Sequence, residues 1–285
     1  MYADLHLHTT ASDGKNTPAE VVALAQQKGF SAIAITDHDA TSGLEGALKA
    51  GEAYGIEVIP GIELSTLEGE REIHILGYYP DPNCRALQDM LAQMIEARST
   101  RATKMVVKLQ DTGVDIDLER VKEIAGGEFI GRPHIASALL EKGYINELSE
   151  AFTREFIGRG GRCYVERFKL TPTEGINILK QAGAIPVLAH PGYLSSGPPL
   201  AEEEITPLIE SGLKGIEAIY SRHTPEQEDY YRQLAEKYNL LVTGGSDCHG
   251  QKEEPNSLGS IKLPYKNVEA LLDERVRQLA EIKRK

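Results

Sequence analysis

Histidines and carboxylates near the start of this chain occupy positions where strands usually carry apolar residues. The stretch YADLHLH, residues 2–8, is typical of a β-strand, in which alternate side chains project to the same face. Asp4, His6 and His8 therefore share one face, where valine or isoleucine would be usual. Imidazole nitrogens and carboxylate oxygens bind divalent metal ions. We predict that this face of the strand lines a metal site.

Further residues of these types lie in, or just after, other strand-like segments. They are Asp13, His38, Glu63, His74, His190, Asp247 and His249. We expect Glu63 to end the third strand, because strand ends in a parallel βα barrel meet at one rim, where active sites are built. With His6 and His8 the set offers nine ligands, so two or three ions fit better than one tetrahedral ion. Without thiolates, the set suits Mn, Fe, Zn or Co.

An alternation of strands and helices must position these residues. Helix starts are marked by Thr-Pro pairs, as at Thr17, where Glu20 completes a capping box. This alternation favours a parallel barrel, formed by residues 1–83 and 171–285 and interrupted by a helical insertion at 84–170. We expect strands at 2–8, 31–36, 56–65, 72–79, 184–190, 213–220 and 240–247. In the insertion we expect helices within 84–125 and at 131–143 and 145–158.

The insertion also carries a basic, glycine-rich segment that could hold an anion. Its side chains between 154 and 169 are Arg154, Arg159, Arg162, Arg167 and Lys169 against Glu155 and Glu166. Gly158, Gly160 and Gly161 would let backbone amides approach an anion, and Arg132 and His134 stand at a helix start, which favours negative charge. We predict a second phosphate site here; the alternative is a solvated basic loop. Lys15 and Asn16, in the first loop, are further candidates for substrate contact.

Composition restricts the classes of protein to which the chain can belong. Its 285 residues have a net charge of −12, whereas general nucleic-acid binders are usually basic. The three cysteines argue against a disulfide scaffold. Because the sequence lacks an apolar run of roughly 18 residues and the features of a signal peptide, we expect a cytoplasmic protein without membrane association. No protein partner is indicated.

Five motifs together resemble those of the PHP family, the polymerase and histidinol phosphatase phosphoesterases. They are DLHLHTTASDG, ITDHD, PGIELS, LAHPG and GGSDCHG, in order between residues 4 and 250. The resemblance implies a distorted (β/α)7 barrel with a trinuclear metal site. One ion would take His6, His8, Glu63 and Asp247; a second Glu63, His74 and His190; a third Asp13, His38 and His249. We expect Mn²⁺, with Fe, Zn or Mg as alternatives.

Three other stretches, GRPHIA, FIGRGGRCYV and YSRHTPEQ, resemble the stand-alone phosphatases of nucleoside 3′,5′-bisphosphates within that family. This resemblance implies release of the 3′-phosphate, which leaves a nucleoside 5′-monophosphate. His223 is a candidate leaving-group acid or substrate contact, or a capping residue before Thr224. The alternatives are a 5′–3′ exonuclease on short RNA, a phosphatase for a smaller ester such as histidinol phosphate, and a metal-binding module without activity.

Overall fold

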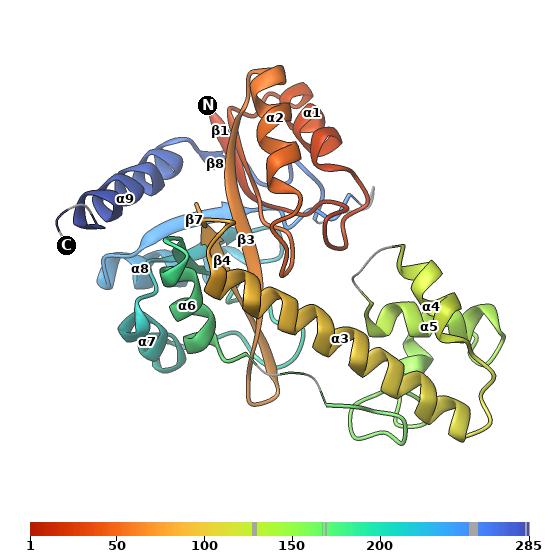
Figure 1. Cartoon of the computed structure of the whole chain (residues 1–285). Helices are drawn as coiled ribbons and strands as arrows, with labels where there is room; N and C mark the ends of the chain where they lie inside the picture. Colours follow the sequence, from red (N-terminus) through yellow and green to blue (C-terminus); the bar gives the residue numbers. More distant parts are fainter. Residues whose placement is uncertain (127–129, 167, 169, 251–255, 283, 285) are drawn as a thin grey trace. The chain divides into compact units, whose positions relative to one another are not determined.

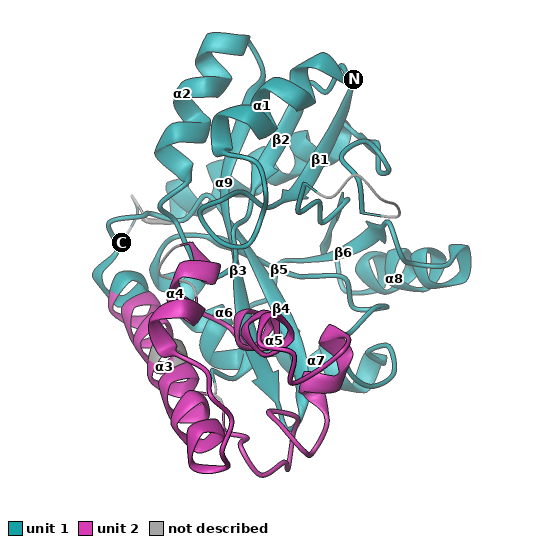
Figure 2. Ribbon diagram, turned by 90° about the vertical axis from the view of Figure 1, so that its right-hand side faces the viewer, with its two compact units in different colours: residues 1–88, 170–285 teal, residues 89–169 magenta. Residues whose placement is uncertain are grey.

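The computed structural model describes residues 1–285 except 127–129, 167, 169, 251–255, 283 and 285. Its description also leaves out the side chains of residues 98, 99 and 282. The chain forms two compact units, which Figure 2 distinguishes by colour. Unit 1 comprises Met1–Gln88 and Leu170–Lys285, and unit 2 comprises Asp89–Lys169. Each unit has its own hydrophobic core and is described by itself.

Unit 1 is built on one sheet with the order β7-β6-β5-β4-β3-β2-β1-β8 (Figure 1). Neighbouring strands are parallel from β1 to β3 and from β5 to β7, whereas β4 runs antiparallel to both β3 and β5. The α/β barrel prediction is therefore confirmed, but the sheet is not wholly parallel and a short eighth strand pairs with β1. The strands are β1 (Tyr2–Leu7), β2 (Ala32–Ile35), β3 (Glu57–Glu68), β4 (Arg71–Tyr78), β5 (Ile185–Leu188), β6 (Gly215–Tyr220), β7 (Leu241–Gly245) and β8 (Leu263–Pro264).

The sheet closes on itself where the end of β1 meets the segment that follows β7. Leu7 forms a parallel bridge with Cys248, and the backbone N–H of His8 donates to the Cys248 carbonyl at 3.0 Å. The N–H of Asp247 donates to the His6 carbonyl at 2.9 Å. The segment that carries His6 and His8 and the segment that carries Asp247 and His249 are thereby joined by backbone hydrogen bonds.

The helices of unit 1 begin where the sequence predicts. Thr17, Thr171 and Thr224 each form a capping box with the side chain three residues later, and each is followed by proline. Leu7, on the opposite face of β1 from the histidines, belongs to the cluster in which Val22 of the first helix and Ala47 of the second are buried. The helices are α1 (Pro18–Gln27), α2 (Leu44–Tyr54), α6 (Pro172–Gln181), α7 (Glu202–Ser211), α8 (Pro225–Lys237) and α9 (Lys266–Ile282).

Unit 2 is mainly helical around a small core that includes Met105, Val121 and Leu139. Its elements are α3 (Arg85–Asp111), which begins in unit 1, α4 (Leu118–Ala125), α5 (Arg132–Glu141) and the 3₁₀ turn η1 (Leu148–Phe152). The prediction of a helix over 145–158 is wrong, because within this range the chain is helical only in the η1 turn. The chain bends back instead, because the Gly158 N–H donates to the Thr153 carbonyl at 2.8 Å. A Cβ at Gly158 would lie 2.1 Å from the Phe152 carbonyl oxygen, so the bend requires glycine.

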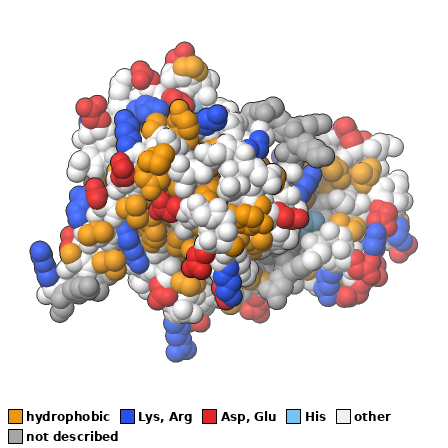
Figure 3. Space-filling model, turned by 90° about the horizontal axis from the view of Figure 1, so that it is seen from above, with side chains coloured by type: hydrophobic (Ala, Val, Ile, Leu, Met, Phe, Trp, Pro, Cys, Tyr) orange, Lys and Arg blue, Asp and Glu red, His pale blue; other side chains and the backbone are white. Residues whose placement is uncertain are grey.

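Charge on the one face drawn in Figure 3 is mixed rather than segregated. On the face drawn in Figure 3, acidic and basic side chains alternate among scattered hydrophobic ones, and the described residues show no continuous basic stripe there. Such a stripe is the usual footprint of a protein that binds long nucleic acids. In the part of the chain that the structure describes, no helix combines the length and apolar character needed to span a bilayer.

We predict that Gly245→Ala destabilises the closure of the barrel. A Cβ at this position would lie 2.3 Å from the His6 Cβ and 2.6 Å from the His6 backbone nitrogen, so β1 would have to move. The free energy of unfolding should fall by about 1–3 kcal/mol, the usual cost of overpacking. Gly46→Ala is the matched control, because its nearest neighbour would be Pro18 Cβ at 3.8 Å in a helix. Equal denaturation midpoints for the two variants would contradict the prediction.

Candidate metal centre

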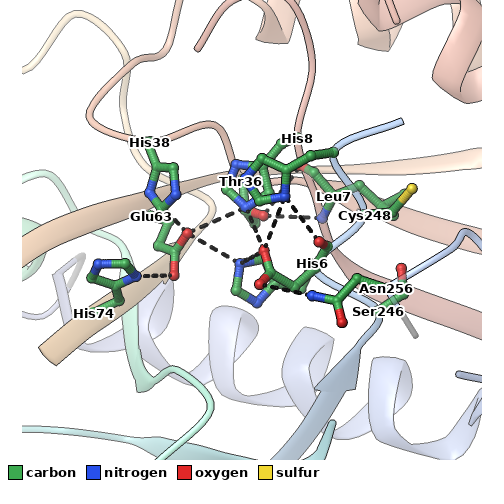
Figure 4. A network of polar contacts seen from close by, with 12 residues as sticks. His6, Leu7, His8, Thr36, His38, Glu63, His74, Ser246, Cys248 and Asn256 are labelled. Carbon is green, nitrogen blue, oxygen red and sulfur yellow. Dashed lines mark hydrogen bonds and ion pairs between the residues drawn. The ribbon is translucent and has the colours of Figure 1, made fainter. Parts of the chain in front are cut away.

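The structure brings the predicted ligands of unit 1 together. Figure 4 shows His6, His8, His38 and His74 pointing toward Glu63. Three groups have ligand atoms within 4.8 Å of one another: His8, Asp13, His38 and His249; His6, His8, Glu63 and Asp247; and His38, Glu63 and His74.

Glu63 lies at the centre of the cluster. Its Oε1 is 2.8 Å from His74 Nδ1 and 3.1 Å from His190 Nε2. Its Oε2 lies within 3.0–3.3 Å of ring nitrogens of three further histidines, His6, His8 and His38. One fully buried carboxylate thus faces five imidazoles.

The long hairpin of β3 and β4 explains how Glu63 and His74 meet. The prediction that Glu63 ends its strand is wrong, because β3 continues to Glu68 and pairs antiparallel with β4 along its second half. Glu63 pairs with Leu76 and Ser65 pairs with His74, so the glutamate and the histidine lie near each other within the sheet.

Asp13, Asp247 and His249 complete the cluster from the loops after β1 and β7. His249 Nε2 is 3.2 Å from an Asp13 carboxylate oxygen, and His8 Nε2 is 3.0 Å from Asp247 Oδ1. Tyr220 donates a hydrogen bond of 2.9 Å to the other Asp247 oxygen. Asp247 and His190 have positive φ angles of 55° and 26°, which are uncommon for residues other than glycine and cluster at functional sites.

The cluster contains buried polar atoms that no hydrogen bond satisfies. Among the described residues, they are His6 Nε2, both ring nitrogens of His8, His38 Nδ1, Glu63 Oε2 and His74 Nε2. Leaving such an atom unsatisfied costs about 1–3 kcal/mol, more if it is charged. Nitrogen and oxygen atoms that converge in this way are a donor set suited to divalent transition ions, so the residues fit a metal centre.

Two carboxylates that support the cluster were not predicted from the sequence. Asp37 accepts from Thr9 N–H at 2.7 Å and from the hydroxyls of Thr9 and Ser12 at 2.8 and 2.7 Å, which holds the loop that carries Asp13. Glu217, fully buried in β6, lies 3.0 Å from His6 Nδ1. Both acids stand in or directly after apolar strand segments, and that placement is the signal that could have identified them.

His223 is engaged at both ring nitrogens. Its Nδ1 lies 2.9 Å from the Ala218 carbonyl, and its Nε2 accepts from the Gly192 N–H at 3.0 Å. The proton therefore sits on Nδ1 and is donated to the backbone. This arrangement favours a positioning role, in which His223 holds the turn after His190, over the predicted role as leaving-group acid.

The other predicted substrate residues fall in two places. In unit 1, Lys15 is exposed, and its backbone N–H donates to the backbone carbonyl of His249 at 3.0 Å. The backbone carbonyl of Asn16 accepts from the backbone N–H of Thr10. The remaining four, Arg132, His134, Arg159 and Arg162, belong to unit 2.

Within unit 2 the anion-binding prediction needs one correction. The N–H groups of Gly158 and Gly161 donate to carbonyls of their own loop and so do not face an anion. His134 Nδ1 accepts from the Gly131 N–H at 3.0 Å and caps α5, and the Arg132 guanidinium lies 5.4 Å from the Phe152 ring centroid. Two further predicted basic residues, Arg167 and Lys169, lie outside the described residues.

Comparison with known families places the chain. The PHP domain family matches residues 4–167. The chain belongs to this family. The chain is therefore a metal-dependent phosphoesterase. The family predicted from its sequence motifs is confirmed.

Three relatives of this chain are named for different substrates. A phosphoribosyl 1,2-cyclic phosphate 1,2-diphosphodiesterase of Eggerthella lenta is 33% identical and aligns over 88% of this chain and 95% of its own. A 3′,5′-nucleoside bisphosphate phosphatase of Chromobacterium violaceum is 31% identical over 90% of each chain. A 5′–3′ exoribonuclease of Escherichia coli is 31% identical over 86% of this chain and 84% of its own.

A solved structure extends the likeness to the fold. The crystal structure of a putative metal-dependent phosphoesterase from Bifidobacterium adolescentis superposes with a TM-score of 0.83 at 33% identity. The match covers 95% of each chain.

Crowding of the imidazoles spreads their pKa values. Burial lowers the pKa of His8, but Asp247 and Glu63 outweigh it and raise the value to about 10. Burial also lowers the pKa of His74, but the carboxylates of Glu63 and Glu72 outweigh it and raise the pKa to about 10. At His38 burial prevails over the attraction of Glu63, and the pKa falls to about 4. In the absence of metal ions, two of these imidazoles therefore hold protons that bound ions would displace.

We predict that the metal-stripped protein loses stability as pH rises from about 6.5 to about 10. The folded-state pKa values of His8 and His74 lie above the unfolded value of 6.5, so their stabilisation is complete below 6.5 and is lost as pH rises through 10. Saturating Mn²⁺ should reverse this slope, because ions bind deprotonated imidazoles. Urea denaturation at pH 6.5, 8 and 9.5 measures both, and His74→Asn should flatten the metal-free slope. A metal-free stability independent of pH over this range would contradict the prediction.

Proposed function

We propose that this enzyme hydrolyses the 3′-phosphate of nucleoside 3′,5′-bisphosphates and releases nucleoside 5′-monophosphates. The observation that carries the proposal is the buried cluster of imidazoles and carboxylates around Glu63, with its unsatisfied donor atoms. The bisphosphate phosphatase of Chromobacterium violaceum, which aligns over nine tenths of both chains, supports this substrate class.

The centre would hold three divalent ions, with Mn²⁺ favoured over Fe, Zn and Mg. His6, His8, Glu63 and Asp247 would hold one, Glu63, His74 and His190 a second, and Asp13, His38 and His249 a third. When bound, such ions supply a hydroxide near neutral pH and neutralise the charge that develops on the phosphoryl oxygens.

The chain's own residues fix these ligands and meet the substrate. Tyr220 holds the Asp247 carboxylate, and His223 holds the turn at Gly192 that follows His190. The backbone N–H of Lys15 donates to the carbonyl of the candidate ligand His249, so its backbone lies beside the cluster. We assign Lys15 and Asn16 to contacts with the reacting phosphate.

The second phosphate of the substrate would be bound by unit 2. Arg132, Arg159 and Arg162 offer guanidinium groups, which bind phosphate with paired hydrogen bonds, and His134 stands beside Arg132 at the start of α5. The substrate is accordingly a small phosphorylated nucleoside, with short oligonucleotides as a further class.

Two other activities are favoured by particular relatives. The Eggerthella lenta relative is named for cleaving a cyclic phosphodiester of a sugar phosphate, and it aligns over 95% of its length. The Escherichia coli relative is named as an exoribonuclease. Both reactions are attacks of water on phosphorus, so the cluster around Glu63 serves them equally well.

A panel of substrates will separate these activities. With Mn²⁺ added to metal-stripped protein, we predict that phosphate release from adenosine 3′,5′-bisphosphate exceeds that from adenosine 3′-monophosphate and histidinol phosphate at least tenfold in kcat/KM. A 1,2-cyclic ribose phosphate and a 5′-phosphorylated RNA trimer test the other two activities. Preference for either of these, or for histidinol phosphate, would contradict the assignment. Loss of all activity in Glu63→Gln shows that the turnover belongs to this site.

We predict that Arg159→Ala and Arg162→Ala raise KM for the bisphosphate by about 10–100-fold, because a hydrogen bond to a charged group contributes about 1.5–3 kcal/mol. Turnover of adenosine 3′-monophosphate, which lacks the second phosphate, should change less than threefold. Arg120→Ala is the matched control, since this arginine of unit 2 is paired with Glu141 at 2.9 Å. A loss of equal size on both substrates would assign the arginines to folding rather than to substrate binding.

A further inference from the structure

Glu217 is a carboxylate placed in the middle of an apolar strand. It stands in the stretch GIEAIY of β6, whose six residues are all buried, and its own exposure is 0%. Within the described residues, no lysine or arginine lies at ion-pair distance from it. A buried carboxylate without a cation is costly unless hydrogen bonds or bound cations compensate its charge. Its partners therefore indicate why it is there.

The partners of Glu217 are two candidate ligands from different strands. Its two oxygens lie 3.0 and 3.2 Å from His6 Nδ1. Oε2 also accepts a 2.8 Å hydrogen bond from the backbone N–H of His190. One side chain on β6 thus reaches β1 on one side and the segment after β5 on the other.

The contact with His6 determines which ring nitrogen carries the proton. Because a carboxylate only accepts, His6 must donate from Nδ1, which leaves the lone pair on Nε2. That nitrogen faces the cluster, 3.2 Å from Glu63 Oε2 and 3.5 Å from Asp247 Oδ1. The carboxylate also makes the imidazole a better donor to a metal ion.

The contact with His190 fixes a strained backbone. His190 has a φ of 26°, and its N–H points to Glu217 while its Nε2 lies 3.1 Å from Glu63 Oε1. Two carboxylates therefore fix this residue: Glu217 accepts from its backbone N–H, and Glu63 contacts its imidazole ring. β6 itself has an irregular register between Glu217 and Ile219, a kind of distortion often found beside active sites.

We propose that Glu217 is the positioning residue of the metal centre: it sets the tautomer of His6 and the orientation of His190 and thereby sets the affinity for metal ions. The proposal rests on the ligand assignment made under the proposed function. Glu217 touches neither substrate nor ions and acts through the two histidines.

The variant Glu217→Gln tests this role at constant size. Its amide has one accepting oxygen, so its NH₂ group must face either His6 or the His190 N–H, and both are donors in the native arrangement. We expect Mn²⁺ affinity, measured by titration calorimetry on metal-stripped protein, to fall about 10–100-fold. Thr243→Val is the matched control, because Thr243 pairs with Glu217 in the sheet, is fully buried, and its hydroxyl forms no hydrogen bond with a predicted ligand among the described residues. It should keep the native Mn²⁺ affinity.

The outcomes separate this proposal from the ligand assignment. Unchanged Mn²⁺ affinity in folded Glu217→Gln overturns the role of Glu217, provided that His6→Asn loses affinity. If His6→Asn and Glu63→Gln also bind Mn²⁺ as the native protein does, the ligand assignment fails instead. Should Glu217→Gln not fold, ¹⁵N imidazole shifts of the native protein decide, with the His6 signals assigned by their loss in His6→Asn. With a diamagnetic ion such as Zn²⁺ bound, a proton on Nδ1 supports the role, and a proton on Nε2 overturns it.

Discussion

The structure depends on keeping one carboxylate, Glu63, buried among imidazoles. Its two oxygens lie within 3.3 Å of ring nitrogens from five histidines, and several of those nitrogens have no hydrogen-bond partner. Polar groups arranged in this way are costly without cations. Metal ions bound here would therefore add to the stability of this arrangement, because they convert unsatisfied lone pairs into bonds. The barrel supplies the stability that holds the ligands in place before ions bind.

That stability comes from closure of the sheet and from local contacts where its two edges meet. The end of β1 is bonded to the segment after β7, and Gly245 leaves room for His6 because it lacks a Cβ. His190 and Asp247, which adopt positive φ angles, are each held by a further side chain. Strain of this kind persists only where surrounding contacts over-determine it. The ligands are thus placed by backbone as much as by side-chain packing.

Sequence alone could predict which candidate ligands the fold gathers, because His6, His8, Glu63 and Asp247 lie in or next to strands that otherwise read as buried. It missed the direction of β4, although β3 and β4 are joined by only Gly69 and Glu70, and a two-residue turn that begins with glycine is a hairpin signal. The helix expected over 145–158 did not form because a tight local bend, in which Gly158 approaches Phe152, overrode helical periodicity. The role of Glu217 depends on contacts across more than 200 residues, which spacing cannot reveal.

Under the proposed function, the chemistry and the choice of substrate would reside in different residues of this protein. Relatives at 31–33% identity are named for a cyclic phosphodiester, a nucleoside bisphosphate and RNA. All three names describe cleavage of a phosphate ester, so they agree on the kind of bond that is broken and differ in the substrate. In this chain the metal-ligand candidates all belong to unit 1, whereas Arg132, Arg159 and Arg162 belong to unit 2. Under the proposed assignment of these arginines to the second phosphate, changes in unit 2 would alter which phosphate ester is bound and leave the candidate metal ligands unchanged.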